Sequence, residues 1–123
     1  MSSTTHTIAN ITTMVRGIIV DRVVSGETNF FTDDEILRAI NLSKNAIFGR
    51  RPEAFLVTYQ SSDNSISTSL PNDYTSSDSI TVAAWAVEPL TYYAASMTLL
   101  QKSKDSFYRE ASEKLLEFYE RSI

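Results

Sequence analysis

The amino-acid sequence predicts a mainly α-helical fold, a four-helix antiparallel bundle with a long Ser/Thr-rich loop or hairpin arm inserted between the two helix pairs. Three observations lead to this prediction. Four stretches carry apolar residues at steps of three and four, the spacing of one buried helix face. The chain has 123 residues, the size of a single domain. Between residues 58 and 81, 12 of 24 residues are Ser or Thr, so this stretch holds too few apolar residues for a core of its own.

The first helix is expected over residues 7–24, with Thr7 as its N-cap. Ser25-Gly26 supplies the end of this helix, because glycine readily takes the left-handed conformation that closes a helix. The residues before Thr7 are polar, and we expect this terminus, including His6, to fray. The buried stripe of the helix comprises Ile8, Ile11, Val15, Ile18, Ile19 and Val23.

The second helix, expected over residues 33–49, has the clearest start signal. Thr32-Asp33-Asp34-Glu35 is a capping box, in which Thr32 caps the helix and Glu35 reaches back to the Thr32 backbone. The three adjacent carboxylates are also possible cation ligands, but their spacing favours the capping interpretation. Pro52 prevents the helix from continuing. The stripe of this helix comprises Ile36, Leu37, Ile40, Ser43 or Lys44, and Ile47.

Residues 55–80 are predicted to form the inserted arm. Residues 55–60 alternate in the manner of a short strand, whereas Asp63-Asn64 and Leu70-Pro71-Asn72-Asp73 are typical of turns. Whether the whole segment is a hairpin or a disordered arm stays open at this point. We expect it to be mobile in the isolated chain and to become ordered on a partner.

Two further helices are expected over residues 82–102 and 105–121. Glu88-Pro89 can mark the true start of the third helix, since proline suits the first helical turn. Alternatively, residues 81–87 form an earlier turn and the helix is kinked at Pro89. Asp105 is the expected N-cap of the fourth helix. The stripe of the fourth helix comprises Tyr108, Ala111, Leu115, Phe118 and Ser122.

The composition excludes several classes of function. The chain has no cysteine and one histidine, which rules out disulfides, thiolate metal sites and most histidine-dependent catalysis. No stretch approaches the ~20 apolar residues of a membrane helix, and the first ten residues lack the basic start of a signal peptide. We therefore predict a protein that is not an enzyme, needs no cofactor or metal, and is made in a cytoplasm.

Charge is unevenly distributed along the chain. The formal net charge is −4, and residues 52–101 hold five acidic and no basic side chains. A broad DNA-binding face needs clustered positive charge, so this distribution argues against one. The compact basic feature is Arg50-Arg51, with Lys44 nearby. Two adjacent arginines are typical of a solvated helix end, and we keep both as candidates for a protein interface.

Aromatic residues are the other candidates for an interface. Many of them fall in the last forty residues, and a small bundle has room for only some in its core. The surplus is typical of a protein–protein surface, where tyrosine and tryptophan are enriched. The interface candidates on the fourth helix are Tyr108, Phe118 and Tyr119.

The run Phe31-Thr32-Asp33-Asp34-Glu35-Ile36-Leu37-Arg38-Ala39-Ile40-Asn41, followed by Ile47 and Arg51-Pro52-Glu53-Ala54, resembles the head-to-tail adaptor (connector) proteins of tailed bacteriophages. That family tends to open with a helix, an aromatic residue and a capping box, and then has E-L-L-R, an Asn, and R-P-D-A at the helix end. A second match, from Pro89-Leu90 to Ser103-Lys104-Asp105, is similar to the family's closing helix pair. Residues 55–84 depart from the family pattern apart from Leu70-Pro71.

The resemblance implies a ring of about twelve copies with lateral heterologous contacts. The ring would dock on the portal protein and receive a tail or nozzle protein. This places the chain in the virion neck, assembled in the host cytoplasm, with packaged DNA passing through without sequence-specific binding. Acidic side chains on the channel wall would repel that DNA. The candidate channel-facing acids are Asp63, Asp73, Asp78 and Glu88.

Two alternatives remain beside the adaptor. One is another virion assembly part, such as a head-completion or tail-terminator protein. The other is a small helical regulatory module that binds nucleic acid, for which Arg50-Arg51 is the supporting feature.

Overall fold

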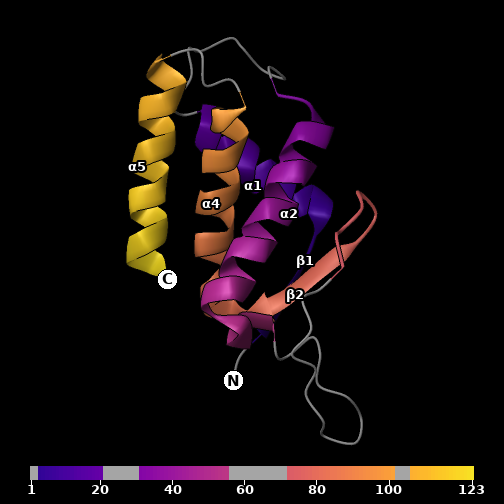
Figure 1. Cartoon of the computed structure of the whole chain (residues 1–123). Coiled ribbons are helices and arrows are strands. Elements are labelled where there is room, and N and C mark those ends of the chain that lie inside the picture. Colours follow the sequence, from indigo (N-terminus) through magenta and orange to yellow (C-terminus); the bar gives the residue numbers. More distant parts are fainter. Residues whose placement is uncertain (1–2, 21–30, 56–71, 102–105) are drawn as a thin grey trace, which may run out of the picture.

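A computed structural model of the chain describes residues 3–20, 31–55, 72–101 and 106–123 (Figure 1). This part of the chain is mainly helical and includes a small two-stranded sheet. The long helices are α1 (Ile8–Val20), α2 (Asp33–Arg50), α4 (Val87–Leu100) and α5 (Ser106–Ser122). The strands are β1 (Ser3–Thr7) and β2 (Ser79–Ala83), and two short 3-10 helices are η1 (Pro52–Phe55) and η2 (Ala84–Ala86).

Helix α4 occupies the centre of the helical layer. It packs against α1, α2 and α5, and Figure 1 shows it lying between α2 and α5. A helix with neighbours on several sides buries residues around much of its circumference. The buried residues of α4 are Pro89, Leu90, Thr91, Ala94, Ala95, Ser96, Thr98 and Leu99.

Two hydrogen bonds show that α4 runs antiparallel to α2. At one end, the Gln101 side chain after α4 donates from Nε2 to the carbonyl of Glu35 in the first turn of α2, at 2.9 Å. Toward the other end, the Ser43 hydroxyl donates to the carbonyl of Leu90 in the first turn of α4, at 2.8 Å. Helix α5 also runs opposite to α4, as the colour order in Figure 1 makes visible.

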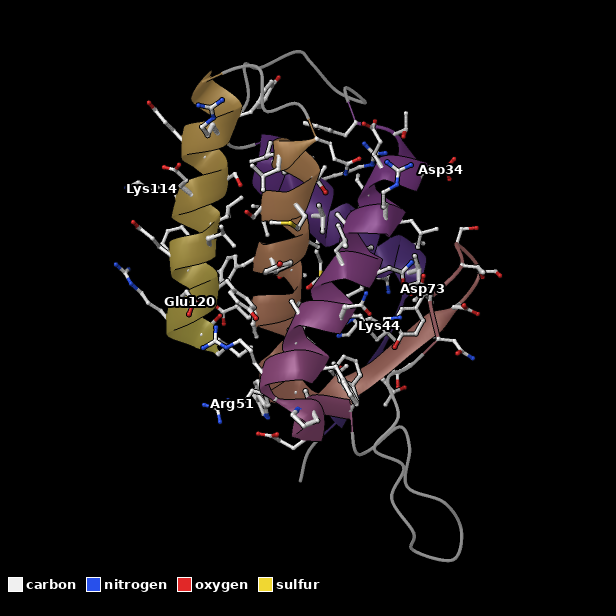
Figure 2. The ribbon with its side chains drawn as sticks, in the orientation of Figure 1. Asp34, Lys44, Arg51, Asp73, Lys114 and Glu120 are labelled. Atoms are coloured by element: carbon white, nitrogen blue, oxygen red, sulfur yellow. The ribbon has the colours of Figure 1, made fainter. Side chains whose placement is uncertain are left out.

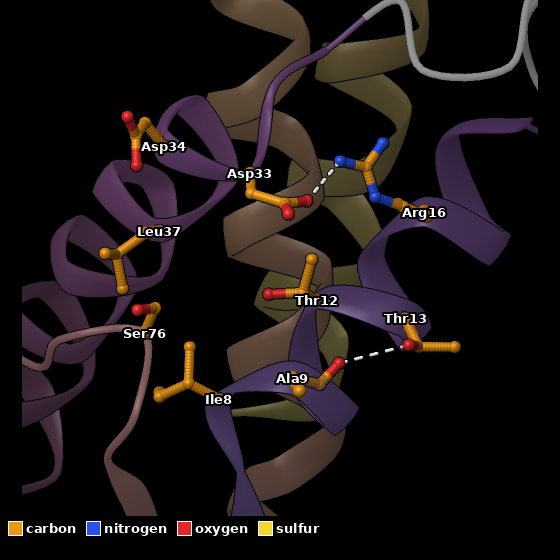
Figure 3. A pocket seen from close by; sticks show the side chains of 9 residues that line it. All are labelled: Ile8, Ala9, Thr12, Thr13, Arg16, Asp33, Asp34, Leu37 and Ser76. Atoms are coloured by element: carbon orange, nitrogen blue, oxygen red, sulfur yellow. Dashed lines mark hydrogen bonds and ion pairs between the residues drawn. The ribbon is translucent and has the colours of Figure 1, made fainter.

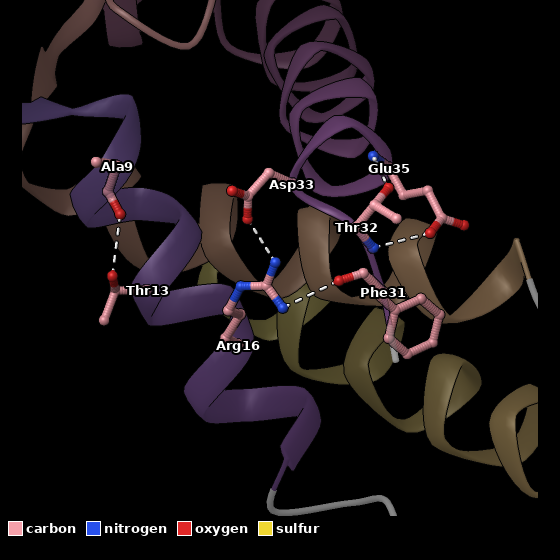
Figure 4. Close-up of polar contacts among 7 residues, drawn as sticks. All are labelled: Ala9, Thr13, Arg16, Phe31, Thr32, Asp33 and Glu35. Carbon is pink, nitrogen blue, oxygen red and sulfur yellow. Dashed lines mark hydrogen bonds and ion pairs between the residues drawn. The ribbon is translucent and has the colours of Figure 1, made fainter. Parts of the chain in front are cut away.

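The capping box at the start of α2 is confirmed. The Thr32 hydroxyl accepts a hydrogen bond from the Glu35 backbone N–H at 3.1 Å, and the Glu35 carboxylate accepts one from the Thr32 N–H at 2.9 Å (Figure 4). The helix ends at Arg50, one residue beyond the expected end. The sequence predicts either Ser43 or Lys44 on the buried stripe, and the structure buries both.

Helix α1 begins where the sequence predicts. The Thr7 hydroxyl accepts a hydrogen bond from the backbone N–H of Asn10 at 3.1 Å, which is N-cap geometry. The expected end of this helix, at residues 21–26, lies outside the described residues. The described stripe is buried at Ile8, Ile11, Val15 and Ile19 and partly buried at Ile18.

The expectation of a frayed N-terminus is wrong. Residues 3–7 form β1, which pairs antiparallel with β2 in a register that sets His6 against Ile80 and Thr5 against Thr81. The Thr5 and Thr81 hydroxyl oxygens are 2.8 Å apart on the outer side of this sheet. Threonine is β-branched and favours strands, but the partner strand lies 76 residues away, so a local pattern could not reveal the pairing.

The described ends of the expected arm at residues 55–80 belong to other elements. Phe55 belongs to η1 rather than to a strand, because Pro52 is well suited to a first helical turn. Residues 56–71 lie outside the described residues. Residues 72–78 are joined to α2 by hydrogen bonds between Asn41 and the Tyr74 backbone. The last two residues of the expected arm begin β2.

The third helix begins later than its stripe alone suggests. The expected helix at 82–102 starts at Val87, after β2 and η2, with Pro89 in its first turn. This agrees with the alternative in which Glu88-Pro89 marks the true start. The expected helix at 105–121 is α5, and the proposed cap Asp105 lies outside the described residues.

Candidate interaction surfaces

Arg50 and Arg51 join the last turn of α2 to the last turn of α5. Arg50 Nη1 lies 2.8 Å from the Glu120 carboxylate, and its guanidinium carbon lies 5.7 Å from the centre of the Tyr119 ring. The hydrogen bond to Glu120 raises the pKa of Arg50 above its ordinary value. Arg51 donates from Nε to the Ile123 carbonyl at 3.3 Å. Both arginines are about half exposed, at 48% and 53%, which fits the prediction of a solvated helix end.

Two of the aromatic interface candidates belong to the core instead. Tyr108 and Tyr119 are 8% and 2% exposed, so neither offers its ring to a partner. The Tyr108 ring packs edge-on against Phe31 at 5.9 Å between centres, and the Tyr119 ring packs edge-on against Tyr93 at 4.9 Å. Burial also raises the pKa of the Tyr119 hydroxyl. The buried stripe of α5 therefore extends to Tyr119, and the rings of Tyr108 and Tyr119 form part of the core.

The third aromatic candidate, Phe118, borders a surface hollow. Its ring lies 5.6 Å from that of Tyr92, and the two line a hollow of about 460 Å³ together with Trp85 from η2. We call this the tryptophan hollow. Trp85 is 41% exposed and lies in a short turn between β2 and α4. It is one of the aromatic residues in the last forty positions from which the sequence predicts a surface. The polar rim of the hollow consists of Glu88, Arg121 and Ser122.

The Glu88 side chain orders one side of the tryptophan hollow. The Tyr92 hydroxyl donates to Glu88 Oε1 at 2.9 Å, which holds the Tyr92 ring against Phe118. Arg121, in the last turn of α5, is exposed and also lines the hollow. The hollow thus combines apolar ring surface with one carboxylate and one guanidinium, a composition typical of protein-binding hot spots.

A second hollow, of about 380 Å³, lies between α1 and the first turn of α2 (Figure 3). We call it the threonine hollow, because Thr12 and Thr13 form part of its wall. Arg16 crosses this gap: it pairs with the Asp33 carboxylate and donates to the Phe31 carbonyl at 3.0 Å (Figure 4). Sequence reasoning assigned Asp33 to the helix start and did not find its partner Arg16, which lies 17 residues earlier.

The candidate channel-facing acids each have a local partner where they are described. The Asp73 carboxylate lies 2.7 Å from the Lys44 ammonium (Figure 2), and the Asp78 carboxylate accepts the Thr75 N–H at 2.7 Å. Glu88 accepts the Tyr92 hydroxyl, as described above. Asp63 lies outside the described residues. The described acids therefore come from two places, the segment before β2 and the start of α4.

Neither a cluster of metal ligands nor a membrane-spanning helix is found in the part of the chain that the structure describes. Within residues 3–20, 31–55, 72–101 and 106–123, no three histidine or carboxylate side chains are grouped to hold a metal ion. The helices of these same ranges include none that is long and apolar enough to cross a bilayer. Comparison with protein-family models, curated proteins and solved structures finds no significant match to this chain.

Proposed function

We propose that this chain is a structural head-to-tail adaptor of a tailed bacteriophage, a subunit of a ring of about twelve copies that sits between the portal and the tail and extends the DNA channel. In this proposal its fold is a four-helix antiparallel bundle with an arm inserted between the helix pairs. The protein performs no catalysis and assembles into the virion neck in the host cytoplasm. The resemblance of residues 31–54 and 89–105 to such adaptors is the starting point.

The observation that carries the proposal is the tryptophan hollow. An exposed tryptophan beside stacked Tyr92 and Phe118, with a guanidinium and a carboxylate at the rim, has the composition of an interface centre. A partner that covers the exposed Trp85 ring would stabilise the complex by about 25 cal/mol for each Å² of apolar surface removed from water. A protein whose role is assembly requires such a surface.

The two hollows suit the geometry of a ring. A ring closes through heterologous contacts, in which one surface of each subunit meets a different surface of the next. The tryptophan hollow is built from η2, α4 and α5, whereas the threonine hollow is built chiefly from α1 and α2. The two share no residue, so one subunit can use both at once. We assign the tryptophan hollow to one lateral contact and the threonine hollow to the other.

The candidate channel-facing acids differ in whether a basic side chain offsets their charge. The charge of Asp73 is offset by Lys44, so this carboxylate contributes little repulsion toward DNA. Glu88 is exposed, and its carboxylate accepts a hydrogen bond from the Tyr92 hydroxyl rather than pairing with a basic side chain in the contacts described above. Glu88 belongs to the rim of the tryptophan hollow, which we assign to a lateral contact, so the proposal that acids line the channel rests on Asp78 and Asp63.

The test is co-assembly with isolated portal rings, measured by analytical ultracentrifugation and native mass spectrometry. The wild-type chain should be monomeric or weakly associated alone and should bind portal in a defined ring. Trp85→Ala should weaken ring formation by about 30-fold, corresponding to the ~2 kcal/mol of a hot-spot residue. Leu42→Ala is the matched control, because Leu42 is 45% exposed on α2 and lies outside both hollows.

Other outcomes of the same experiment distinguish the alternatives. Retention on DNA that falls with salt, without portal binding, would support the nucleic-acid-binding module. Binding to isolated tails but not to portal would support a tail terminator. Equal assembly of the Trp85→Ala and wild-type chains would remove the tryptophan hollow from the interface.

A further inference from the structure

A short segment before β2, residues 72–78, covers part of α2, and we call it the strap. Asn41 of α2 holds its backbone at Tyr74 through two hydrogen bonds. The Asn41 amide donates from Nδ2 to the Tyr74 carbonyl at 3.1 Å, and its Oδ1 accepts the Tyr74 N–H at 2.8 Å. One side-chain amide thus satisfies both polar groups of one residue, as a neighbouring strand would. Because both hydrogen bonds go to backbone atoms, this contact does not depend on which side chain the bound residue carries.

The second contact, made by Lys44, depends on the side chains of the strap. Lys44 lies one helical turn after Asn41 and is fully buried, with 0% of its side chain exposed. Its ammonium nitrogen lies 2.7 Å from the Asp73 carboxylate and 5.6 Å from the centre of the Tyr74 ring (Figure 2). A buried ammonium requires such partners, because its removal from water is costly. Lys44 therefore selects an acidic residue followed by an aromatic one.

The strap is anchored at its far end independently of Asn41 and Lys44. The Asp78 carboxylate accepts the Thr75 N–H at 2.7 Å, and the Asp78 N–H donates to the Thr75 carbonyl at 3.1 Å, which closes a turn. The Asp78 carbonyl also accepts the N–H of Ile8 at 3.0 Å, which fixes this turn to the start of α1. The Asp73 side chain, in contrast, is 75% exposed, so water already solvates much of this carboxylate and its release from Lys44 exposes little that is not exposed already.

From this geometry we infer that Asn41 and Lys44 form a recognition site for a peptide segment in which an acidic residue is followed directly by an aromatic one. The chain's own Asp73-Tyr74 occupies this site, and a segment of another protein with the same chemistry displaces it. The inference depends on the contacts of the strap and is independent of the adaptor role. It gives the strap a second state, released from α2 and still anchored at Asp78.

The probe is a fluorescent hexapeptide with the sequence of residues 72–77, Asn-Asp-Tyr-Thr-Ser-Ser, and binding is followed by anisotropy. The receptor is the full chain with the double substitution Asp73→Asn and Tyr74→Ala, which weakens the internal ligand. This variant should bind the peptide at least about tenfold more tightly than the wild-type chain does, because the internal segment competes in the wild type. Circular dichroism and the melting temperature show whether it is folded.

Two controls separate recognition from nonspecific association. Adding Asn41→Ala to the double variant should lower peptide affinity by about tenfold or more, through the loss of two hydrogen bonds. A peptide with Asn and Ala in place of its Asp and Tyr should not bind. A folded double variant with no higher affinity than the wild type, or equal binding of both peptides, would overturn the inference.

Hydrogen exchange on the wild-type chain keeps the inference testable if the double variant does not fold. Millimolar hexapeptide should accelerate exchange of the Tyr74 amide, which the strap protects through Asn41, and leave the amides of α4 unchanged. Two results together would contradict a releasable strap. The peptide would leave the exchange rate of the Tyr74 amide unchanged, and this rate would be no faster than the rates in the core helices.

Discussion

Ser96 of α4 and Ser112 of α5 face each other in the core, with their hydroxyl oxygens 2.7 Å apart and both side chains buried. Each hydroxyl also lies within hydrogen-bond distance of the other residue's carbonyl, at 3.0 and 3.2 Å. This reciprocal contact requires the two helix backbones to approach closely. It satisfies two polar groups that would otherwise be unpaired in an apolar interface.

We expect the size of the residue at position 96 to control the packing of α4 on α5. Ser96→Ala should lower the free energy of unfolding by about 1 kcal/mol, through the loss of a buried hydrogen bond. Ser96→Leu should lower it by about 1–3 kcal/mol, because no space exists for the larger side chain. Urea unfolding measures both. Glu113→Leu places the same residue on the exposed face of α5 and should change stability little.

The capping box makes a separate contribution to stability. Thr32→Ala should lower the free energy of unfolding by about 1 kcal/mol, because it removes the acceptor for the Glu35 N–H. Thr32→Ser should retain most of the wild-type value. Thr13→Ala is the control, since the Thr13 hydroxyl donates backward to the Ala9 carbonyl within α1 and alanine favours a helix interior. A loss for Thr13→Ala as large as for Thr32→Ala would argue against the capping explanation.

Substituting Lys44 and substituting its partner Asp73 should change the free energy of unfolding in different directions. Lys44→Met keeps most of the side-chain volume and removes the charge, so the free energy of unfolding should stay equal or rise. Asp73→Asn leaves the Lys44 ammonium without this carboxylate and should lower the free energy by about 1–3 kcal/mol, a range reduced for the exposure of Asp73. Thermal and urea unfolding of the two variants test this. Greater damage from Lys44→Met than from Asp73→Asn would reverse the argument.

Tyr119 gives the chain a pH-dependent stability at alkaline pH. Burial raises the pKa of its hydroxyl, so the unfolded chain loses this proton at a lower pH than the folded chain does. The free energy of unfolding should therefore fall as the pH rises through and above the ordinary tyrosine value of about 10. Tyr119→Phe should reduce this fall. Urea unfolding of both chains between pH 8 and 11 measures the difference.

The same variant should be tolerated at neutral pH. The Tyr119 hydroxyl is buried and has no hydrogen-bond partner among the described residues, so its removal leaves no donor or acceptor behind. Tyr119→Phe should keep or raise the free energy of unfolding at pH 7. A loss of more than about 1 kcal/mol would show that the hydroxyl has a bonding role.

Local signals made some of this structure predictable from the sequence. The start of α2 follows from Thr32 and Glu35, because both partners of the capping box lie within four residues. The prediction for α5 was wrong at one position: the expected stripe included Phe118, whereas the structure buries Tyr119 and leaves Phe118 partly exposed. Phe118 and Tyr119 follow Leu115 by three and four residues, and both spacings suit one helix face. The choice of Tyr119 depends on packing against Tyr93, which no periodicity encodes.

The contacts between distant segments could not be predicted in this way. The pairing of β1 with β2, the ion pair of Arg16 with Asp33 and that of Lys44 with Asp73 join residues whose separation in the chain gives no local pattern. Trp85 is one of the aromatic residues in the last forty positions from which the sequence predicts a surface, but its exposure depends on how η2 turns between β2 and α4. These long-range contacts shape the two hollows and the strap, so the sites were harder to predict than the helices.

The pairing of β1 with β2 also bears on the order of folding events. The α4–α5 hairpin can form early, since its two helices are adjacent along the chain. The sheet instead closes a loop in which Thr5 meets Thr81, 76 residues later, and closure of so long a loop carries a large entropic cost. We therefore expect sheet closure to come late and to limit the folding rate. Removal of residues 1–7 should then weaken the folded state while leaving early helix formation almost unchanged.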